Sequence, residues 1–554
     1  MKMIWVEMRH HLVAWVILFG LTLILQYRNG AYASEFGNHP DEAAHYVTGI
    51  MVHDFFWNGD WCHPRLFAEN YYVHYPKVAI GHWPPFFYLL QAVWMSIFPL
   101  GRTSLVLFMA VLTTSLAMVV YRTARGLYGT WTGLALGGLF LLLPPVQRSS
   151  AMVMADILVA FLCLKATLAF ARFLDQGRWQ DAFAFGLWSS MSIMTKGTGL
   201  ALALVPVLAI LFSRRFSLIR RWSFWLPAFI VVGLCGPWYY LTLGMVKSGW
   251  FESTMSWSYS LRAISSYSKE AISSLGVGLL VLGIIGLIGR LNLPSQREVA
   301  CGVRCAFDAW AIAYIALLCI VPCGVEQRFL LPILPVFMLI AAAGANQLAQ
   351  SLTNKLNFVP PTRFTSGLIS LLILAFIPFS SQVKSTHGYA EPANRILEQS
   401  ENRSLVILVA ADSSGEGMFV SEIALRDRQH LHVVLRTSKV LSSSHWVGKD
   451  FKLRFATTDQ VARYLVHLAV DFIVLDMTIP RDKQDVDQRQ LLSSLQSTSP
   501  PFRLAGKFPL VRRDTVFTEG IHVYCRQTSG SSNPRILRVP MEAMLGRTLE
   551  IALP

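Results

Sequence analysis

Charged residues are scarce in this chain. Lys, Arg, Asp and Glu together make up 15% of its 554 residues, whereas they make up about 25% of an ordinary soluble domain. Hydrophobic residues make up 53%, and the mean hydropathy is +0.44. A soluble chain of this length cannot bury so much apolar surface, but a lipid bilayer can cover it. The composition therefore excludes a disordered chain, a fibrous protein and a simple soluble enzyme, and it predicts an integral membrane protein with many spans.

Cysteine is also scarce, and no nucleotide-binding fingerprint is complete. The eight cysteines are too few for a disulfide framework in a chain of this length. Of the two C-x3-C pairs, Cys301/Cys305 has no His nearby and Cys319/Cys323 lies in an apolar run. We interpret both pairs as thiols rather than as metal sites. The GEG at 415–417 is too short to count as the G-x-G-x-x-G of a dinucleotide site.

Positive charge exceeds negative charge. Lys and Arg number 48 and Asp and Glu number 33, which gives a net charge of +15. In a soluble protein this excess would suggest nucleic-acid binding, but the sequence has no basic stripe with interleaved aromatic residues. Lys and Arg gather on the cytoplasmic loops of membrane proteins, and that bias alone accounts for the excess. We therefore expect the lipid bilayer as a partner and no nucleic acid.

Long apolar runs begin close to the N-terminus. The first extends from Leu12 to Leu25, and no small-residue cleavage signal follows closely, so we expect a retained span rather than a removed signal peptide. Lys2 and Arg9 place the N-terminus in the cytoplasm. Further apolar runs lie at about 84–100, 103–121, 130–146, 152–174, 181–195, 197–213, 222–243, 274–290, 308–323, 329–350 and 365–384.

The basic loops set the expected topology. Clusters of basic residues occur in alternate loops, at 122–125, 172–178, 214–221, 290–304 and 355–363. If 84–100 and 103–121 both crossed fully, all these clusters would lie outside, against the positive-inside rule. We therefore expect one of the two runs to cross and the other to be interfacial or half-inserted. The result is about eleven crossings, with the N-terminus inside and the C-terminus outside, in the plasma membrane of a bacterium.

The composition changes after about residue 388. Strand-like runs at 405–411, 431–437 and 471–476 alternate with helical stretches near 417–428, 458–469 and 486–496. This alternation is typical of a small α/β domain. The expected organisation is a transmembrane catalytic domain over 1–388, with its first external loop at 28–83, followed by a soluble extracytoplasmic α/β domain over 389–554.

Two acidic sites stand out on the predicted outer face. Asp41 and Glu42 follow Pro40 at a predicted helix start, where the helix dipole stabilises negative charge; a helix cap with a first-turn acid is the ordinary alternative. Asp156 lies at the outer end of an apolar span, and ionisable groups at membrane depth are costly and usually functional. Carboxylates on one face can hold a divalent cation or act as a base, so a metal of unknown identity is a candidate cofactor with Asp156 as its ligand.

Four cationic residues are placed on the same face by this topology. They are Lys77, His82, Lys196 and Arg328. A group of Lys, His and Arg at the lipid boundary suits a phosphate-bearing lipid, although each alone is compatible with an interfacial anchor. Lys196 is notable because TKGTG interrupts two apolar runs. We therefore take all four as candidate substrate-binding residues.

These residues carry a resemblance to a known family. Asp41-Glu42 in the first external loop resembles the acidic motif of the GT-C membrane glycosyltransferases, and most closely the protein O-mannosyltransferase and aminoarabinose transferase group, called glycosyltransferase family 39-like. Four further segments resemble that family's K-P-P-L-x-Y-W segment, second acidic motif, S-K-G-P turn and R-Y-L-L-P helix entry: HWPPFFYLL from 82, MADILVAF from 154, TKGTG from 195 and EQRFLLPILP from 326. The resemblance covers about residues 1–350.

The resemblance implies a fold, a reaction and residue roles. The fold is a polytopic α-helical membrane protein with about 11–13 transmembrane helices, here followed by the soluble α/β domain. The implied reaction is transfer of a sugar from a polyprenyl-phosphate donor to a glycan, lipid or protein acceptor, with inversion at the sugar. Asp41 would be the catalytic acid/base, Glu42 would support it or bind the acceptor, and Asp156 would hold a metal or the donor phosphate. The family's Lys before Pro-Pro is Trp83 here, so a donor-phosphate role would pass to His82 or Lys77.

Other classes of protein remain as alternatives. A membrane transporter or lipid flippase with an accessory extracytoplasmic domain would carry mid-span charges and broken helices in two halves, whereas most polar residues here lie at span ends. A nucleotide-sugar enzyme would use the D-x-D at 485–487, but that pattern opens a predicted helix, where capping is the common role. A receptor would need far fewer spans than about eleven.

Overall fold

The computed structural model describes residues 2–250, 254–292, 301–356, 367, 372, 385–400, 403–443, 451–497, 501–527, 535–540 and 548–553. It divides into two compact units. The first unit comprises Met1–Asn29, Trp83–Phe87 and Val106–Gln382, and the second comprises Gly30–His82, Tyr88–Leu105 and Val383–Pro554. The first external loop therefore groups with the C-terminal part of the chain, whereas the domain division expected from the sequence kept it with the membrane helices.

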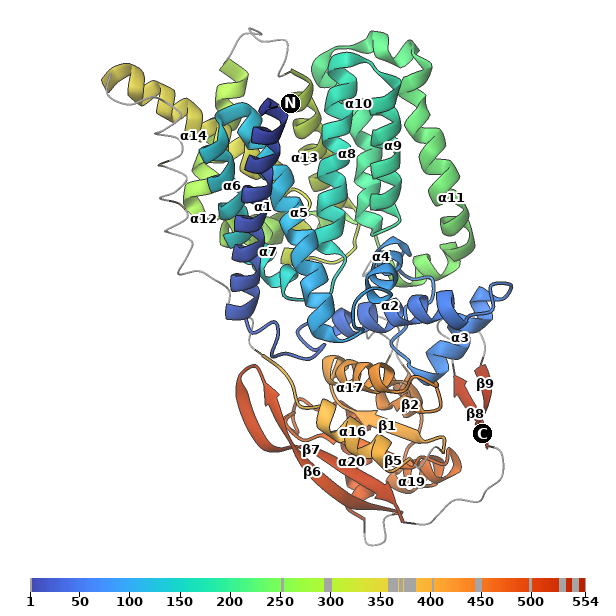
Figure 1. Ribbon diagram of the computed structural model, residues 1–554. Coiled ribbons are helices and arrows are strands. Elements are labelled where there is room, and N and C mark those ends of the chain that lie inside the picture. The colour runs from blue at the N-terminus through green and yellow to red at the C-terminus, as the bar shows by residue number, and fades with distance from the viewer. Residues whose placement is uncertain are drawn as a thin grey trace. The chain divides into compact units, whose positions relative to one another are not determined.

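The described part of the first unit is helical (Figure 1). Its α-helices are α1 (Lys2–Arg28), α5 (Arg102–Tyr128, shared with the second unit), α6 (Thr130–Leu142), α7 (Pro144–Ser150), α8 (Asp156–Gln176), α9 (Trp179–Ile193), α10 (Val205–Ser213), α11 (Trp222–Trp250), α12 (Trp257–Asn292), α13 (Cys301–Ile320) and α14 (Leu334–Leu356). Short 3₁₀ helices connect them at η1 (Gly197–Leu204), η2 (Phe216–Arg220) and η4 (Gln327–Leu330).

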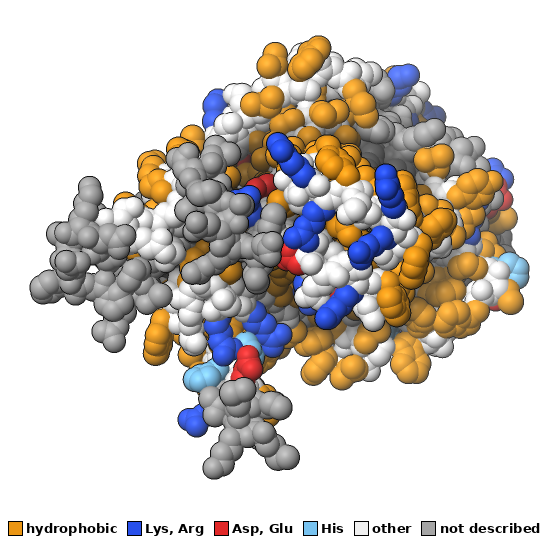
Figure 2. Space-filling model, turned by 90° about the horizontal axis from the view of Figure 1, so that it is seen from above, with side chains coloured by type: hydrophobic (Ala, Val, Ile, Leu, Met, Phe, Trp, Pro, Cys, Tyr) orange, Lys and Arg blue, Asp and Glu red, His pale blue; other side chains and the backbone are white. Residues whose placement is uncertain are grey.

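Six helices in the described part of the chain are long and apolar enough to cross a membrane. They are Glu7–Arg28, Arg102–Tyr128, Asp156–Gln176, Trp222–Gly244, Trp257–Ile288 and Gly302–Ile320. Large apolar side chains on α11 are exposed, with Phe229 at 75% and Val232 at 70%. A water-soluble protein rarely exposes such a surface, whereas lipid covers it at no cost. Figure 2 shows such hydrophobic side chains around scattered Lys and Arg side chains on one face.

The apolar runs predicted at 84–100 and 103–121 form helices of very different length. The run 84–100 contains only α4 (Phe86–Met95), which has 10 residues and at 1.5 Å per residue spans about 15 Å, half of a bilayer core. The run 103–121 lies in α5, which has 27 residues. Of the two, α5 is among the candidate spans and α4 is a shorter apolar helix; a single full crossing between residues 84 and 121 stays a prediction. The predicted run 365–384 lies outside the described residues except for 367 and 372.

The second unit contains a mixed sheet with helices. The helices are α2 (Pro40–Asn58), α3 (Pro64–His74), α4, α16 (Ala390–Glu398), α17 (Ser413–Arg426), α18 (Thr437–Val440), α19 (Thr458–His467) and α20 (Val486–Leu495). The strands are β1 (Val406–Ala410), β2 (Val433–Arg436), β3 (Ser442–Ser443), β4 (Lys452–Leu453), β5 (Phe472–Asp476), β6 (Phe502–Arg512), β7 (Thr515–Arg526), β8 (Arg535–Pro540) and β9 (Thr548–Leu553). The main sheet has the order β2-β1-β5-β7-β6.

The three predicted strands and three predicted helices of the α/β domain are confirmed. Strands β2, β1 and β5 are parallel neighbours, and their buried Val, Ile and Leu side chains form a core with α19 and α20. The antiparallel hairpin β6–β7 was not predicted. Its two-residue turn is Arg513-Asp514, both with positive φ; such turns normally carry Gly or Asn, so the sequence lacked the usual signal.

Helix α17 packs closely on α2 within the second unit. A Cβ added at Gly417 of α17 would lie 2.8 Å from the Cβ of Ala43 and 3.2 Å from the Cε of Lys77. A side chain there would force the two helices apart, so glycine permits the close approach. Through this contact the loop 30–82 packs on the α/β domain, and Val73 of α3 belongs separately to the core formed by the sheet with α19 and α20.

The carboxylate of Glu35 joins the first external loop to the start of the C-terminal part. Its oxygens accept hydrogen bonds from the backbone N–H groups of Gly388 at 3.0 Å, Tyr389 at 3.0 Å and Ala390 at 3.1 Å. Backbone donors away from water need such acceptors. One side chain therefore satisfies three consecutive donors at the entry to α16.

Glu35→Ala should destabilise the second unit. The substitution leaves three part-buried backbone donors without their acceptor; a fully buried unsatisfied group costs about 1–3 kcal/mol, and water offsets part of that cost here. We expect a lower unfolding temperature of the detergent-purified protein and faster protease cleavage near residue 388. Glu391→Ala, at an exposed residue of the same segment, is the matched control and should change neither. Equal behaviour of the two variants would contradict this role for Glu35.

Candidate active site

Helix α2 begins where the sequence predicted, but its cap is different. His39 is the N-cap, its Nδ1 accepts the backbone N–H of Asp41 at 3.1 Å, and Pro40 occupies the first helical position. Asp41 is therefore not needed as the cap. Its side chain is 27% exposed, with one carboxylate oxygen 3.6 Å from His39 Nδ1. The first-turn acid thus keeps a partly accessible carboxylate in the positive field of the helix N-terminus.

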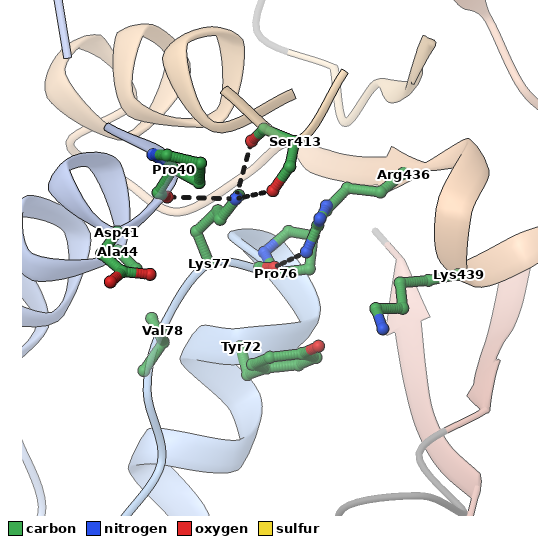
Figure 3. Close-up of a pocket in the computed structure, with 10 residues that line it drawn as sticks. All are labelled: Pro40, Asp41, Ala44, Tyr72, Pro76, Lys77, Val78, Ser413, Arg436 and Lys439. Atoms are coloured by element: carbon green, nitrogen blue, oxygen red, sulfur yellow. Dashed lines mark hydrogen bonds between the residues drawn. The ribbon is translucent and has the colours of Figure 1, made fainter. Parts of the chain in front are cut away.

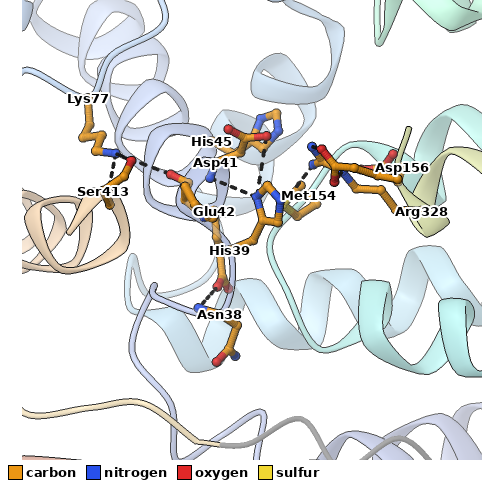
Figure 4. Close-up of polar contacts among 12 residues, drawn as sticks. Asn38, His39, Asp41, Glu42, His45, Lys77, Met154, Asp156, Arg328 and Ser413 are labelled. Carbon is orange, nitrogen blue, oxygen red and sulfur yellow. Dashed lines mark hydrogen bonds and ion pairs between the residues drawn. The ribbon is translucent and has the colours of Figure 1, made fainter. Parts of the chain in front are cut away.

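Glu42 has a different environment from its neighbour. Its side chain is fully buried, and one oxygen accepts a hydrogen bond from Arg102 at 3.1 Å. The other oxygen accepts the backbone N–H of Asn38 at 3.3 Å (Figure 4). Because this carboxylate is buried and already paired, an acceptor substrate cannot reach it in this arrangement. Of the two roles predicted for Glu42, support of Asp41 is compatible with this environment, since Glu42 holds the start of α2 in place.

Asp41 and Lys77 line one pocket in the second unit. Its volume is about 190 Å³, and its lining includes residues from the α/β domain. Figure 3 shows the ten lining residues, which are Pro40, Asp41, Ala44, Tyr72, Pro76, Lys77, Val78, Ser413, Arg436 and Lys439. The pocket combines one carboxylate with three cationic side chains.

Lys77 is buried and held by oxygen atoms. Its Nζ donates to the backbone oxygen of Ser413 at 2.9 Å and lies 3.5 Å from both Ser413 Oγ and the backbone oxygen of Pro40. Burial, and then the positive charge of Arg436, lower the pKa of Lys77 to about 7, against the opposing effect of the Glu416 and Asp41 carboxylates. The ammonium is therefore close to its titration midpoint at neutral pH.

Arg436 and Lys439 reach the pocket from the α/β domain. Arg436 Nε donates to Glu416 at 2.6 Å and its Nη1 to the backbone oxygen of Pro76 at 3.2 Å. Glu416 is 1% exposed and also accepts from Ser438 Oγ at 2.8 Å. This buried acid fixes the arginine. Burial, and then the charge of Arg436, lower the pKa of Lys439 to about 8.

A second charged cluster lies in the first unit. Lys196 Nζ donates to Asp156 at 2.6 Å, and Arg328 Nη1 lies 3.9 Å from the other oxygen of Asp156. The Nε and Nη2 atoms of Arg328 also donate hydrogen bonds to the two carboxylate oxygens of Glu326, at 2.7 and 3.0 Å. Its Nη1 atom contacts the sulfur of Met154 (Figure 4). The ring of Phe329 lies 4.5 Å from the Lys196 ammonium. Two cations and two acids thus balance one another.

The local sequence explains the position of Lys196. Helix α9 ends at Ile193, and Lys196 is the N-cap residue of η1. A Cβ at Gly199 would lie 2.6 Å from Ser192 Oγ, so the glycine of TKGTG allows the chain to fold back tightly. Asp156 lies at the first position of α8. The predicted grouping of Asp156, Lys196 and Arg328 therefore exists.

The donor set does not fit the predicted divalent metal. Asp156 and Glu326 are both occupied by cationic partners, which would repel a metal ion. In the described part of the chain, no group of three or more His, Cys, Asp and Glu side chains is arranged to hold one. No role is therefore assigned to a metal below.

The remaining candidates are placed as follows. His82 is 7% exposed and lies in the turn before α4, outside the lining of the pocket. Asp41 belongs to the second unit and Asp156 to the first, so their shared site stays a prediction. The D-x-D at 485–487 starts α20, where Asp487 accepts a hydrogen bond from the Ser442 hydroxyl at 2.9 Å.

The sequence did not reveal three residues that line the pocket, Ser413, Arg436 and Lys439. No local pattern marks a residue that faces a loop distant in the sequence.

Comparison with known proteins gives a family match over part of the chain. Residues 82–240, less than half of the chain, match the family described as dolichyl-phosphate-mannose-protein mannosyltransferase. No curated protein matches the chain in sequence.

Solved structures share the fold. ArnT from Cupriavidus metallidurans bound to undecaprenyl phosphate superimposes with a TM-score of 0.56 at 14% identity, over 93% of this chain and 98% of that one. The Archaeoglobus fulgidus oligosaccharyltransferase in complex with Zn and sulfate gives 0.52 at 15% identity, over 84% and 68%. The archaeal oligosaccharyltransferase AglB from Archaeoglobus fulgidus, in complex with an inhibitory peptide and a dolichol-phosphate, gives 0.52 at 13% identity, over 85% and 70%. The family match and the shared fold confirm the predicted resemblance and the predicted fold class.

Lys196→Met should destabilise the first unit. The substitution leaves the buried Asp156 carboxylate with Arg328 at 3.9 Å as its remaining ion pair, and breaking one side of a buried pair costs about 3–5 kcal/mol. Thermal unfolding of the purified protein should show this loss, and adding Asp156→Asn should restore part of it. Lys165→Met is the control: it removes an ammonium group that lies over the Trp188 ring, and it should lower the unfolding temperature less than Lys196→Met. If Lys196→Met unfolded at the same temperature as the wild type, the Lys196–Asp156 ion pair would not contribute to stability.

Proposed function

We propose that this GT-C glycosyltransferase moves a sugar from a polyprenyl-phosphate carrier to an acceptor at the outer face of the membrane, with inversion at the sugar carbon. The observation that carries the proposal is the accessible first-turn carboxylate of Asp41 in a pocket lined by cations. The fold supports it, because relatives with this fold were solved with undecaprenyl phosphate and with a dolichol-phosphate.

Asp41 is the proposed catalytic base. In a single displacement the acceptor oxygen forms a bond to the anomeric carbon while the bond from that carbon to the carrier phosphate breaks. The acceptor loses a proton, which Asp41 takes, and the electron pair leaves with the phosphate. Partial exposure lets a substrate reach Asp41, and the start of α2 keeps its charge favourable. Glu42 positions this turn through Arg102.

Lys196 and Arg328 are the proposed partners of the carrier phosphate. Negative charge grows on the phosphate as the sugar leaves, and preorganised cations stabilise it. Asp156 and Glu326 hold the two cationic side chains in place before substrate arrives. In this proposal Asp156 acts through Lys196 and Arg328 rather than through a metal, so it is a positioning residue.

The orientation is part of the proposal. Nucleotide sugars are cytoplasmic, so an enzyme at the outer face of a bacterial plasma membrane needs a lipid-tethered donor. The alternation of basic loops supports a cytoplasmic N-terminus and an external α/β domain. The same assignment puts Asp41, in the loop packed on that domain, on the outer side.

A reporter fused after residue 390 tests the orientation. Alkaline phosphatase folds into an active enzyme only after export, so the fusion should be active, and a cytoplasmic reporter at the same position should be inactive. A fusion within the basic segment at 214–221 is the control and should give the reverse pattern. Cytoplasmic activity of the fusion after residue 390 would overturn the proposed outer-face site.

Asp41→Asn tests the catalytic role. A base acting in the transition state contributes about 10²–10⁴-fold, so the release of polyprenyl phosphate on acceptor glycosylation should fall by roughly two or more orders of magnitude. The cap is His39, so folding should be retained, as should binding of undecaprenyl phosphate. The assay uses purified protein with donor lipid and acceptor extracted from source-cell envelopes, and it separates transfer from lipid flipping, which breaks no bond.

Asp60→Asn is the matched control for Asp41→Asn. Asp60 lies in the same loop and is 61% exposed, so its substitution should leave transfer near normal. If folded Asp41→Asn kept more than about a third of normal activity, Asp41 would not be the base.

A further inference from the structure

We infer that the pocket lined by Lys77, Arg436 and Lys439 binds an anionic, phosphate-type group of the acceptor. This assignment rests on the proposed function, since Asp41 in the same pocket is the proposed base. It gives the C-terminal α/β domain a role, which is to supply two of the three cations. The acceptor is accordingly a molecule that carries a phosphate close to the oxygen that receives the sugar.

The charges of the lining residues are unbalanced. Three cationic side chains and one carboxylate line the pocket. The nearby Glu416 is engaged by Arg436, Thr437 and Ser438, so it serves to position the arginine. In the described part of the chain, no hydrogen bond or ion pair is recorded for the Lys439 ammonium. A bound anion would compensate this excess of positive charge.

The cations of the pocket destabilise one another. The positive charge of Arg436 disfavours the protonated forms of both Lys77 and Lys439, in addition to their burial. Structural stability alone would not favour such an arrangement, because like charges in a partly desolvated site repel. Sites that must bind an anion are arranged in this way, since the ligand relieves the repulsion.

The donors approach from three elements. Lys77 comes from the loop after α3, Arg436 from the end of β2 and Lys439 from α18 (Figure 3). The planar guanidinium suits a phosphate through two parallel N–H bonds, and the lysines act as point charges. Ligand pockets for whole small molecules measure about 300–1,000 Å³. At about 190 Å³, this pocket suits one charged group, with the rest of the acceptor outside.

The pocket suits the acceptor better than the lipid donor. None of its ten lining residues lies on the six candidate spans of the described chain, whereas the polyprenyl tail of the donor must lie in the bilayer. The group bound here also shares its pocket with Asp41, which must contact the acceptor. The same phosphate chemistry could come from the donor, so the experiment separates the two sources.

The test measures binding of two probes to the full-length protein in nanodiscs. Sulfate represents the anionic group, and undecaprenyl phosphate represents the donor. Lys439→Gln should weaken sulfate binding about tenfold, as expected for one lost charge-assisted contact, and leave undecaprenyl phosphate binding within about twofold. Lys439→Arg should restore most of the sulfate affinity. Lys483→Gln, an exposed lysine of the same domain that lies outside the pocket, should change neither.

A pH series on the wild type gives an independent measurement. Sulfate keeps its charge between pH 6.5 and 9, whereas Lys77 and Lys439 lose protons through about 7 and about 8. Asp41, Tyr72, Glu416 and Arg436 are the other ionisable groups around them. A lysine with a lowered pKa is cationic below that value, so sulfate affinity should fall by about fivefold or more as the pH rises over this range.

Several outcomes would overturn the inference. They are undetectable sulfate binding, unchanged sulfate affinity in Lys439→Gln, affinity independent of pH, or an equal loss of undecaprenyl phosphate binding, which would make this the donor's site. None of these results depends on turnover. Normal transfer by Asp41→Asn would end the proposed reaction, whereas sulfate binding would still report on the pocket.

Discussion

The close contact between α17 and α2 is the constraint on which the candidate site depends. At Gly417 there is no room for a side chain, because Ala43 and Lys77 already occupy that space. The absence of a Cβ lets a helix of the α/β domain lie directly against the first helix of the external loop. Asp41 stands at the start of one helix, and Ser413, which accepts from Lys77, at the start of the other. The site's geometry is thus a consequence of how tightly two helices pack.

Several charged groups in the two clusters are held by partners of opposite charge. Glu416 fixes Arg436, Arg102 fixes Glu42, and Asp156 fixes Lys196. Desolvated charges are costly unless they are paired, so these networks explain how a mostly apolar chain retains so many buried ions. Asp156 lies between the cations of Lys196 and Arg328, whereas Lys77 is held by uncharged oxygen atoms of Ser413 and Pro40. This difference separates a preorganised cluster from a pocket that can still accept an anion.

The fold and the chemistry are consistent with each other. The membrane unit has the helix lengths and exposed apolar surface of a protein that lipid surrounds, which suits a lipid-linked donor. The second unit combines the loop 30–82 with the C-terminal α/β domain, and it contains the pocket proposed for the acceptor. The C-terminal domain, whose role in this reaction the sequence left open, thereby supplies Arg436 and Lys439 to a site that also contains the acid of the family motif.

The sequence by itself determined the properties that depend on local order. Composition predicted the membrane, periodicity predicted β1, β2, β5 and their helices, and Pro40 with two acids marked the start of α2. The residues of the family-like motifs could likewise be named, including Asp156, Lys196 and Arg328. Only the tertiary structure decided that His39 is the cap, that Glu42 is buried against Arg102, and that Lys77 contacts Ser413, which is 336 residues away. The physical reason is that propensity and hydrophobic pattern act over a few neighbouring residues, whereas a pocket depends on which distant surfaces can pack without leaving charge or volume unmatched.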